Sequence, residues 1–222
     1  MARRPISQIL GHREFWSLDF EVTEATLDPR PDSETLVAAV LERMASPARI
    51  LDLGTGTGCL LLSLLHERPG AWGLGIDRSP AAAAVAARNA RRLGLGARAA
   101  FAVSDWDSAL SGTFEAVVSN PPYIPDAEIE GLAPEVAWHE PRSALAGGVD
   151  GLDAYRRIAR VLPSLLAPGG LAALEVGAGQ APDVARLLAA EGLVEIATAH
   201  DLASVERVVL AKKGLANPPA SH

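Results

Sequence analysis

The chain has 222 residues, of which 49% are hydrophobic and 5% aromatic. This length is enough for one α/β domain with a buried core. A formal net charge of −7 excludes a general basic field for nucleic-acid phosphates, so we expect no direct binding of nucleic acid. Cys59 is the only cysteine, which excludes an internal disulfide; with no signal-peptide core and no apolar run of membrane-spanning length, the sequence predicts a cytoplasmic protein without a membrane segment.

The predicted elements begin with a small β-hairpin at residues 13–27, where apolar and polar side chains alternate in part, and a helix at 33–44. From residue 49 on, apolar runs of strand length alternate with segments of helix length, which is typical of a parallel sheet with helices on both faces. The predicted strands are 49–53, 73–77, 97–104, 114–120, 171–177, 194–200 and 206–213, and the intervening helices are 59–68, 80–93, 151–166 and 182–191.

This order predicts an α/β fold with a seven-stranded, mostly parallel sheet that ends in a C-terminal antiparallel hairpin and is preceded by the small β-hairpin. We divide the chain into a linker with the β-hairpin at 1–30, the α/β domain at 31–213, and a flexible tail at 214–222. The five histidines are scattered without ligand spacing, so no metal site is expected.

The loop after the strand at 49–53 reads DLGTGTGC. Glycines at alternate positions let the chain turn tightly into the next helix and let a ligand lie against the backbone. Asp77 lies 19 residues beyond the last of these glycines, where it can accept both hydroxyls of a ribose, although a carboxylate that caps the following helix would look the same. The pattern suits NAD as well as S-adenosylmethionine. The predicted cofactor-binding residues of the loop are Gly54, Thr55, Gly56, Thr57 and Gly58.

The strand at 114–120 ends in SNPPY, at the edge where an open α/β sheet binds its ligands. Two consecutive prolines donate no backbone hydrogen bond, so they leave bare carbonyl oxygens for a substrate. A second Asn-Pro-Pro at 217–219 has neither a preceding buried strand nor a following tyrosine. The tripeptide by itself therefore does not predict a substrate site; the strand before it and the tyrosine after it are also needed. With this motif the chain resembles the amino-methyltransferases of the class I S-adenosylmethionine-dependent superfamily, in which the motif holds a planar nitrogen for methylation.

Further segments resemble, in order and spacing, the glutamine methyltransferases that modify peptide-chain release factors. The segments are ILGHREFW (9–16), PRPDSE (29–34), ILDLGTGTG (50–58), SDW (104–106), SNPPYI (119–124), EPRSAL (140–145) and ERVVL (206–210). The resemblance covers nearly the whole chain. It implies a Rossmann-like methyltransferase domain over 31–213, S-adenosylmethionine as cofactor, and as partner a release factor with a Gly-Gly-Gln tripeptide; we expect a monomer.

Members of this family usually carry a helical domain ahead of the hairpin, and here eight residues precede ILGHREFW. Either the chain is a shortened form, or it recognises its substrate with the catalytic domain alone. The resemblance also implies that Asn120 contacts the cofactor and that Trp106 lines an adenine pocket, for which a core tryptophan is the alternative. It implies that Arg30 lies beside the active site, where the segment 29–34 reads equally well as a helix start.

Methyl transfer to an amide mainly requires that the amide nitrogen be held in the right orientation, which the residues of this motif can do. We expect the Asn120 side-chain oxygen and the Pro121 carbonyl to accept the two N–H groups of the glutamine amide, with Pro122 in the substrate site and Tyr123 packed on the amide face. Orientation of this kind supplies several of the roughly 7 to 11 kcal/mol available from proximity. Two other functions remain open: methylation of an exocyclic amine of a nucleic-acid base, and a binding module without turnover.

Overall fold

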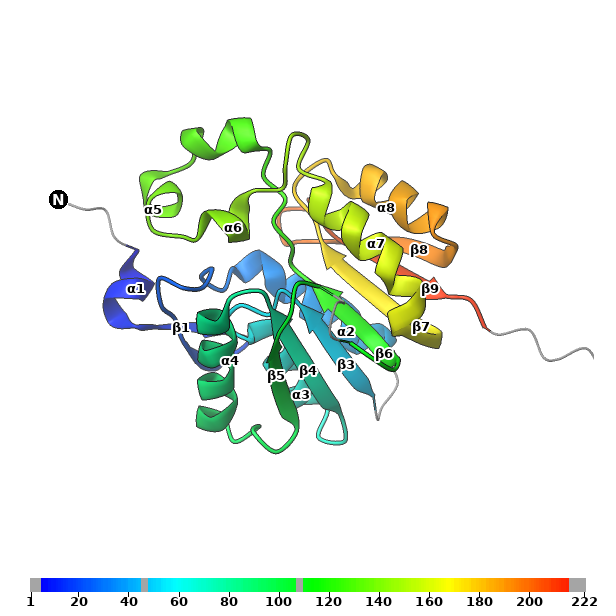
Figure 1. Ribbon diagram of the computed structural model, residues 1–222, viewed down its shortest axis with the longest axis horizontal. Helices are drawn as coiled ribbons and strands as arrows, with labels where there is room; N and C mark the ends of the chain where they lie inside the picture. The colour runs from blue at the N-terminus through cyan, green and yellow to red at the C-terminus, as the bar shows by residue number, and fades with distance from the viewer. Residues whose placement is uncertain (1–4, 45–47, 107–109, 216–222) are drawn as a thin grey trace, which may run out of the picture.

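Two β-sheets organise residues 5–44, 48–106 and 110–215, which are the residues that this computed structural model describes (Figure 1). The predicted tail lies outside the described residues from position 216 on. Strands β1 (His12–Phe15) and β2 (Leu18–Glu21) form the small hairpin. The large sheet contains β3 (Arg49–Leu53), β4 (Trp72–Asp77), β5 (Ala99–Val103), β6 (Phe114–Ser119), β7 (Leu166–Glu175), β8 (Leu193–His200) and β9 (Glu206–Lys213).

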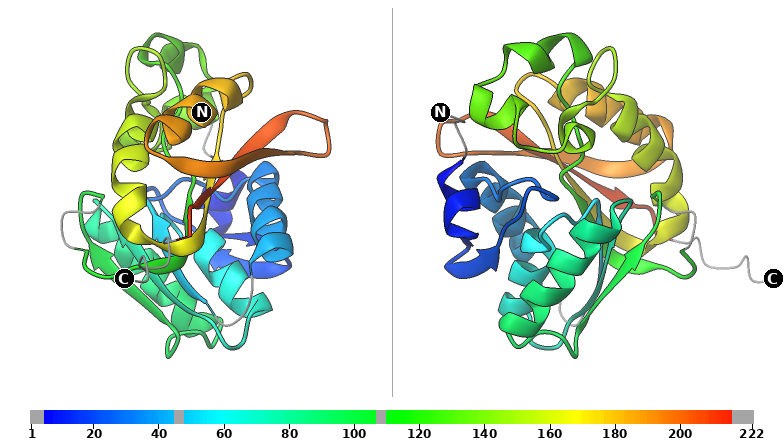
Figure 2. Two further views of the ribbon diagram at one scale, coloured as in Figure 1. Left: turned by 90° about the vertical axis from the view of Figure 1, so that its right-hand side faces the viewer. Right: turned by 60° about the vertical axis from the view of Figure 1, so that its left-hand side comes forward.

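The large sheet has the order β5-β4-β3-β6-β7-β9-β8, with β3 to β7 parallel and β9 antiparallel to both of its neighbours. This confirms the predicted mostly parallel sheet of seven strands with a C-terminal antiparallel hairpin. In Figure 2 (left) the β8–β9 hairpin reaches out beyond the rest of the sheet. Because the strand order reverses between β3 and β6, the loops that follow these two strands diverge and leave a crevice between them.

Helices cover both faces of the sheet. The helical segments are α1 (Ile6–Leu10), η1 (Pro31–Ser33), α2 (Glu34–Arg43), α3 (Cys59–Glu67), α4 (Pro80–Arg92), η2 (Asp126–Gly131), α5 (Pro134–Ala137), α6 (Arg142–Leu145), α7 (Asp153–Leu165) and α8 (Ala181–Ala190). Among the described residues, no helix is both long and apolar enough to cross a lipid bilayer.

The alternation of side chains along the strands builds two separate cores. Ile50 packs in the cluster that contains α2, α3 and the end of α4, whereas its neighbour Leu51 packs in the cluster that contains α7 and α8. The same alternation holds for Val118 and Val117 on β6. Successive side chains of a strand point to opposite faces, so a strand buried on both sides is apolar along most of its length.

The N-terminal hairpin is attached to the first of these cores. Phe15 and Phe20 are buried and meet edge to face, with ring centroids 6.2 Å apart. Asn89 of α4 is fully buried and joins the hairpin to the glycine loop, because its Nδ2 donates to the carbonyl oxygens of Glu21 and Thr57. The hairpin therefore holds the segment that follows it, residues 22–30, against the carboxyl end of the sheet.

Three local predictions were wrong. The hairpin strands end at Glu21 instead of residue 27, because the following segment turns through the Thr23 to Thr26 hydrogen bond. The segment APGG at 167–170 does not separate α7 from β7; it lies inside β7, where the pairing with β6 shifts between Phe114 and Ala116. Residues 126–145, for which the sequence predicted no helix or strand, contain the short helices η2, α5 and α6, which Figure 1 shows above the carboxyl ends of the strands.

Candidate active site

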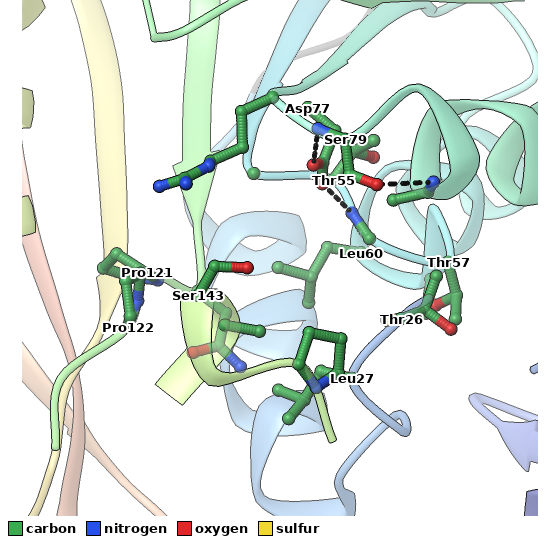
Figure 3. A pocket seen from close by; sticks show the side chains of 18 of the residues that line it. Thr26, Leu27, Thr55, Thr57, Leu60, Asp77, Ser79, Pro121, Pro122 and Ser143 are labelled. Carbon is green, nitrogen blue, oxygen red and sulfur yellow. Dashed lines mark hydrogen bonds between the residues drawn. The ribbon is translucent and has the colours of Figure 1, made fainter. Parts of the chain in front are cut away.

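A pocket opens at the carboxyl ends of the parallel strands and encloses about 1060 Å³ of empty space, counted with the part open to solvent. Its walls come from the loops after β3, β4, β5 and β6, from the segment after the hairpin, and from α6. In Figure 3, Asp77 and Ser79 stand on one side of this pocket and Pro121 and Pro122 on another. The two motifs that the sequence singled out therefore share one cavity.

The glycine loop has backbone geometry that favours glycine at each alternate position. Gly54, Gly56 and Gly58 have φ angles of +74°, +54° and +81°. A Cβ atom on Gly54 or Gly56 would meet nothing within 4 Å, so these positions present bare backbone to open space. A Cβ on Gly58 would lie 3.1 Å from Leu62 Cδ1 and 3.2 Å from Ala86 Cβ. Gly58, which does not line the described pocket, thus permits the close packing of α3 on α4.

The two threonines of the loop line the pocket, and one of them also anchors the loop to β3. Thr55 and Thr57 line the pocket but are nearly fully buried. The Thr55 hydroxyl donates to Oδ2 of Asp52 at 2.7 Å, which ties the loop to its own strand. Burial raises the pKa of the Asp52 carboxyl to about 7, the hydrogen bond from Thr55 lowers it, and the nearby charge of Asp77 raises it further.

Asp77 connects the turn that follows β3 with the turn that follows the neighbouring strand β4. Its Oδ2 accepts from the N–H of Gly56 at 3.0 Å, and its Oδ1 accepts from the N–H of Ser79 at 2.8 Å (Figure 3). Ser79 in turn caps α4 by accepting from the Ala82 N–H at 3.2 Å. Each oxygen of the Asp77 carboxylate keeps a free lone pair, so this arrangement leaves capacity for two hydroxyl donors from a ligand.

Only part of the motif SNPPY lines the pocket. Asn120, Pro121 and Pro122 line the pocket. Tyr123 does not line it among the described residues: its ring lies against the backbone of Gly177, and its carbonyl accepts from Gln180 Nε2 at 2.9 Å. Burial raises the pKa of the Tyr123 hydroxyl. The predicted packing of Tyr123 on a substrate amide therefore needs the ring to turn toward the pocket.

Trp106 combines the two alternatives that the sequence left open. It lines the pocket, and it also packs against the apolar cluster under α7. The guanidinium of Arg157 lies 5.9 Å from its ring centroid and forms an ion pair with Asp105 at 2.9 Å. The backbone of Trp106, in the loop after β5, has φ of +57°, an uncommon conformation for a bulky residue.

Arg30 lines the pocket from the segment after the hairpin. Its Nη2 lies 2.5 and 2.7 Å from the two carboxylate oxygens of Glu140, whose side chain is 1% exposed. Burial raises the pKa of Glu140 and the charge of Arg30 lowers it. The sequence pattern EPRSAL pointed to this segment, but only the fold shows that its glutamate is the partner of Arg30.

Several residues of the pocket carry no sequence motif of their own. They are Ala25, Thr26, Leu27, Asp28, Leu60, Ile76 and Ala82. Two other residues lie next to the motif: Ser33, which also lines the pocket, accepts from Asn120 Nδ2 at 3.3 Å, and Glu175 is a buried carboxylate at the end of β7. A glutamate at the end of an otherwise apolar strand was a visible signal that our reading of the sequence passed over.

Comparison with known proteins identifies the relatives of this chain. Residues 26–146 match the family model of the methyltransferase small domain. A release factor glutamine methyltransferase from Rhodospirillum rubrum is 56% identical over 222 residues, which is 99% of this chain and 68% of that relative. A crystal structure of a release-factor-specific protein-(glutamine-N5) methyltransferase from Alicyclobacillus acidocaldarius is 32% identical with a TM-score of 0.51, over 84% of this chain and 94% of that one.

A methyltransferase from Pyrococcus furiosus, 16% identical, matches 95% of this chain and 93% of its own with a TM-score of 0.67, which shows the shared fold. The sheet order, the glycine loop and the pocket at the switch point thus define a class I S-adenosylmethionine-dependent methyltransferase. Within this class, the chain belongs to the release factor glutamine methyltransferase family. The cavity beside the bare backbone of Gly54 and Gly56 suits the methyl donor of that family.

Proposed function

We propose that this protein transfers a methyl group to the side-chain amide nitrogen of a glutamine in a peptide-chain release factor. The observation that carries the proposal is the shared cavity, in which Asn120 and Pro121 face the same space as Gly56 and Asp77. A methyl donor and a planar amide can therefore meet there. The names of the relatives supply the release factor as substrate. Because release factors act in translation, we place the activity in the cytoplasm, and we propose that a single chain suffices.

The reaction places one main demand on the protein. The nitrogen of an amide is a weak nucleophile because its lone pair is delocalised into the carbonyl. S-adenosylmethionine supplies an activated methyl group on a positively charged sulfur. The protein must therefore hold the nitrogen in line with that group, and a near-attack geometry is worth up to roughly 7 to 11 kcal/mol of the barrier in favourable cases.

The residues of the motif would orient the substrate amide by accepting hydrogen bonds from its N–H groups. The side-chain oxygen of Asn120 and the backbone carbonyl of Pro121 would each accept one N–H of the substrate amide. Neither Pro121 nor Pro122 offers a backbone donor that could pair with the amide oxygen in the wrong orientation. Gly54, Gly56 and Asp77 would hold the donor on the opposite wall, with Trp106 beside it and Arg30 at the edge nearest the substrate.

The test is the fate of a labelled methyl group. Purified protein is incubated with labelled S-adenosylmethionine and, in separate reactions, with a release factor, with the same factor carrying Gln→Ala in its Gly-Gly-Gln tripeptide, and with DNA and RNA. We expect label only in the unaltered release factor, on the peptide that contains that glutamine. Label in nucleic acid would show a base methyltransferase, and bound but untransferred donor would show a binding module without turnover.

A further inference from the structure

Asn120 and Glu175 lie at the ends of neighbouring strands. In the pairing of β6 with β7, Ser119 is opposite Leu174, so the next residues of the two strands stand side by side. Ala173 and Leu171, which share the parity of Glu175, pack on the face covered by α2. Glu175 therefore points to the face where η1, at the start of α2, places Ser33.

Glu175 is buried, although ionisable carboxylates are rarely fully buried unless they are paired. Its exposure is 3%, that of Ser33 is 2%, and Glu175 Oε2 has no hydrogen-bond partner among the described residues. The side-chain NH₂ of Asn120 donates to Ser33 Oγ at 3.3 Å. The side chains of Ser33 and Asn120 both lower the pKa of the Glu175 carboxyl, so both lie close to it. The three polar groups thus form one cluster, in which Ser33 and Asn120 line the pocket and Glu175 is buried beside them.

This cluster determines which end of the Asn120 carboxamide faces the pocket. The two ends of a carboxamide have nearly the same size, so packing alone does not distinguish its oxygen from its nitrogen. An ionised carboxylate only accepts hydrogen bonds, and it therefore attracts the NH₂ end. With the NH₂ end bound to Ser33 and attracted by the nearby Glu175 carboxylate, the oxygen of Asn120 is left for the pocket.

We propose that Glu175 is a positioning residue that, together with Ser33, fixes the Asn120 carboxamide with its oxygen toward the substrate amide. This inference rests on the proposed function, because the Asn120 oxygen accepts a hydrogen bond only if the N–H group of a substrate amide enters the pocket. Protonation of Glu175 would remove the preference, since a carboxylic acid can also donate and the carboxamide could then turn over.

The surroundings of Glu175 set where this protonation occurs. Burial raises the pKa of Glu175 to about 7; hydrogen bonds from Ser33 and Asn120 and the charge of Arg207 on β9 lower it, and the charge of Asp32 on η1 raises it. Burial and then the charge of Glu175 raise the pKa values of Tyr123 and Tyr155, and the Tyr155 hydroxyl donates to the backbone carbonyl of Glu175 at 2.8 Å. Glu175 is thus ionised above pH 7 and protonated below it, so turnover should fall as the pH is lowered through about 7.

The experiment compares Glu175→Gln with Glu115→Gln, a control at the opposite end of β6, where Glu115 pairs with Arg49. Glu175→Gln is expected to bind S-adenosylmethionine as the wild type does, to keep KM for the release factor within a few-fold, and to lower kcat by roughly 10- to 100-fold. Its kcat should also lose the dependence on pH near 7. Glu115→Gln should keep the wild-type kcat and pH profile. Wild-type kcat and pH profile in Glu175→Gln would overturn the proposal.

A second measurement works without turnover and without substrate. The side-chain NH₂ resonances of Asn120, assigned by their loss in Asn120→Ala, should shift with an apparent pKa near 7 in the wild-type protein. They should not shift in that range in Glu175→Asn or Glu175→Gln, whichever folds. Resonances that stay constant in the wild type would reject the contact even if methylation succeeds. If they titrate but no release factor is methylated, the proposed function fails while the positioning contact stands.

Discussion

Arg30 and Glu140, 110 residues apart in the chain, form an ion pair in which the carboxylate is 1% exposed and the guanidinium side chain 36% exposed. The pair fastens the segment after the N-terminal hairpin to the segment that carries α6. Both segments line the pocket. The unequal burial of the partners has a consequence that mutation can test.

Arg30→Ala should destabilise the protein more than Glu140→Ala. Removing Arg30 leaves Glu140 buried without its cation, which costs roughly 2 to 4 kcal/mol, the lower part of the range for buried pairs because Arg30 is partly exposed. Removing Glu140 leaves an arginine that can reach water. The deficit of Arg30→Ala should shrink at pH 5 relative to pH 8, because burial already raises the pKa of Glu140 and protonation removes the charge. Urea unfolding at both pH values measures this; equal deficits for the two variants would contradict it.

Asp77→Ala should weaken binding of S-adenosylmethionine by about 1.5 to 3 kcal/mol, as expected for a lost hydrogen bond to a charged group. The variant also frees the N–H groups of Gly56 and Ser79, which loosens the loop that faces the ligand. Titration calorimetry measures the affinity. Glu115→Ala is the control, since it removes a carboxylate far from the pocket; equal affinity in both variants would remove Asp77 from the cofactor site.

Gly58→Ala and Gly54→Ala should fail in different ways. Both residues have positive φ, so alanine is strained at either position. Only at Gly58 does the new Cβ press on Leu62 and Ala86, and we expect an additional loss of about 1 to 3 kcal/mol in the free energy of unfolding. Gly54→Ala should mainly lose cofactor affinity, because its Cβ enters open space at the pocket. Denaturation and calorimetry on both variants separate the effects; the same stability loss in both would argue against the packing role of Gly58.

Asn120→Ala should leave folding and cofactor affinity nearly unchanged and lower kcat by roughly 10² to 10³, the usual effect of removing one preorganised hydrogen-bonding group. Asn120→Asp adds a negative charge near the positively charged sulfur, so it should bind the donor at least as well as the wild type and methylate the release factor poorly. The control is Asn217→Ala, in the second Asn-Pro-Pro. Wild-type turnover in either Asn120 variant would end the assignment of this residue to the reaction.

Asp52→Asn should stabilise the cofactor-free protein at high pH. The pKa of Asp52 is raised from 3.8 to about 7 on folding, mainly by burial. The folded state therefore holds this proton up to a higher pH than the unfolded state, and stability falls as pH rises from about 4 to about 7. We expect the variant to exceed the wild type by up to about 4 kcal/mol at pH 8 and to match it near pH 4. Thermal unfolding across this range checks the sign; a constant difference would refute it.

The sequence alone determined the elements of the sheet and the two motifs at its carboxyl edge. Strand periodicity places Asp77 at the end of β4 and SNPPY at the end of β6. The turn chemistry of glycine marks the loop after β3, because only glycine adopts these φ angles without strain. These signals are local: each is written in a few consecutive residues whose backbone geometry depends little on the rest of the chain.

The tertiary structure alone decided which distant groups meet. Nothing in the local pattern pairs Arg30 with Glu140, places Glu175 behind Asn120, or turns the ring of Tyr123 toward Gly177. These contacts depend on the order of strands in the sheet and on the path of the segment between β6 and α7. Strand order is set by the packing of whole layers, whereas one sequence records only which face of each strand is apolar.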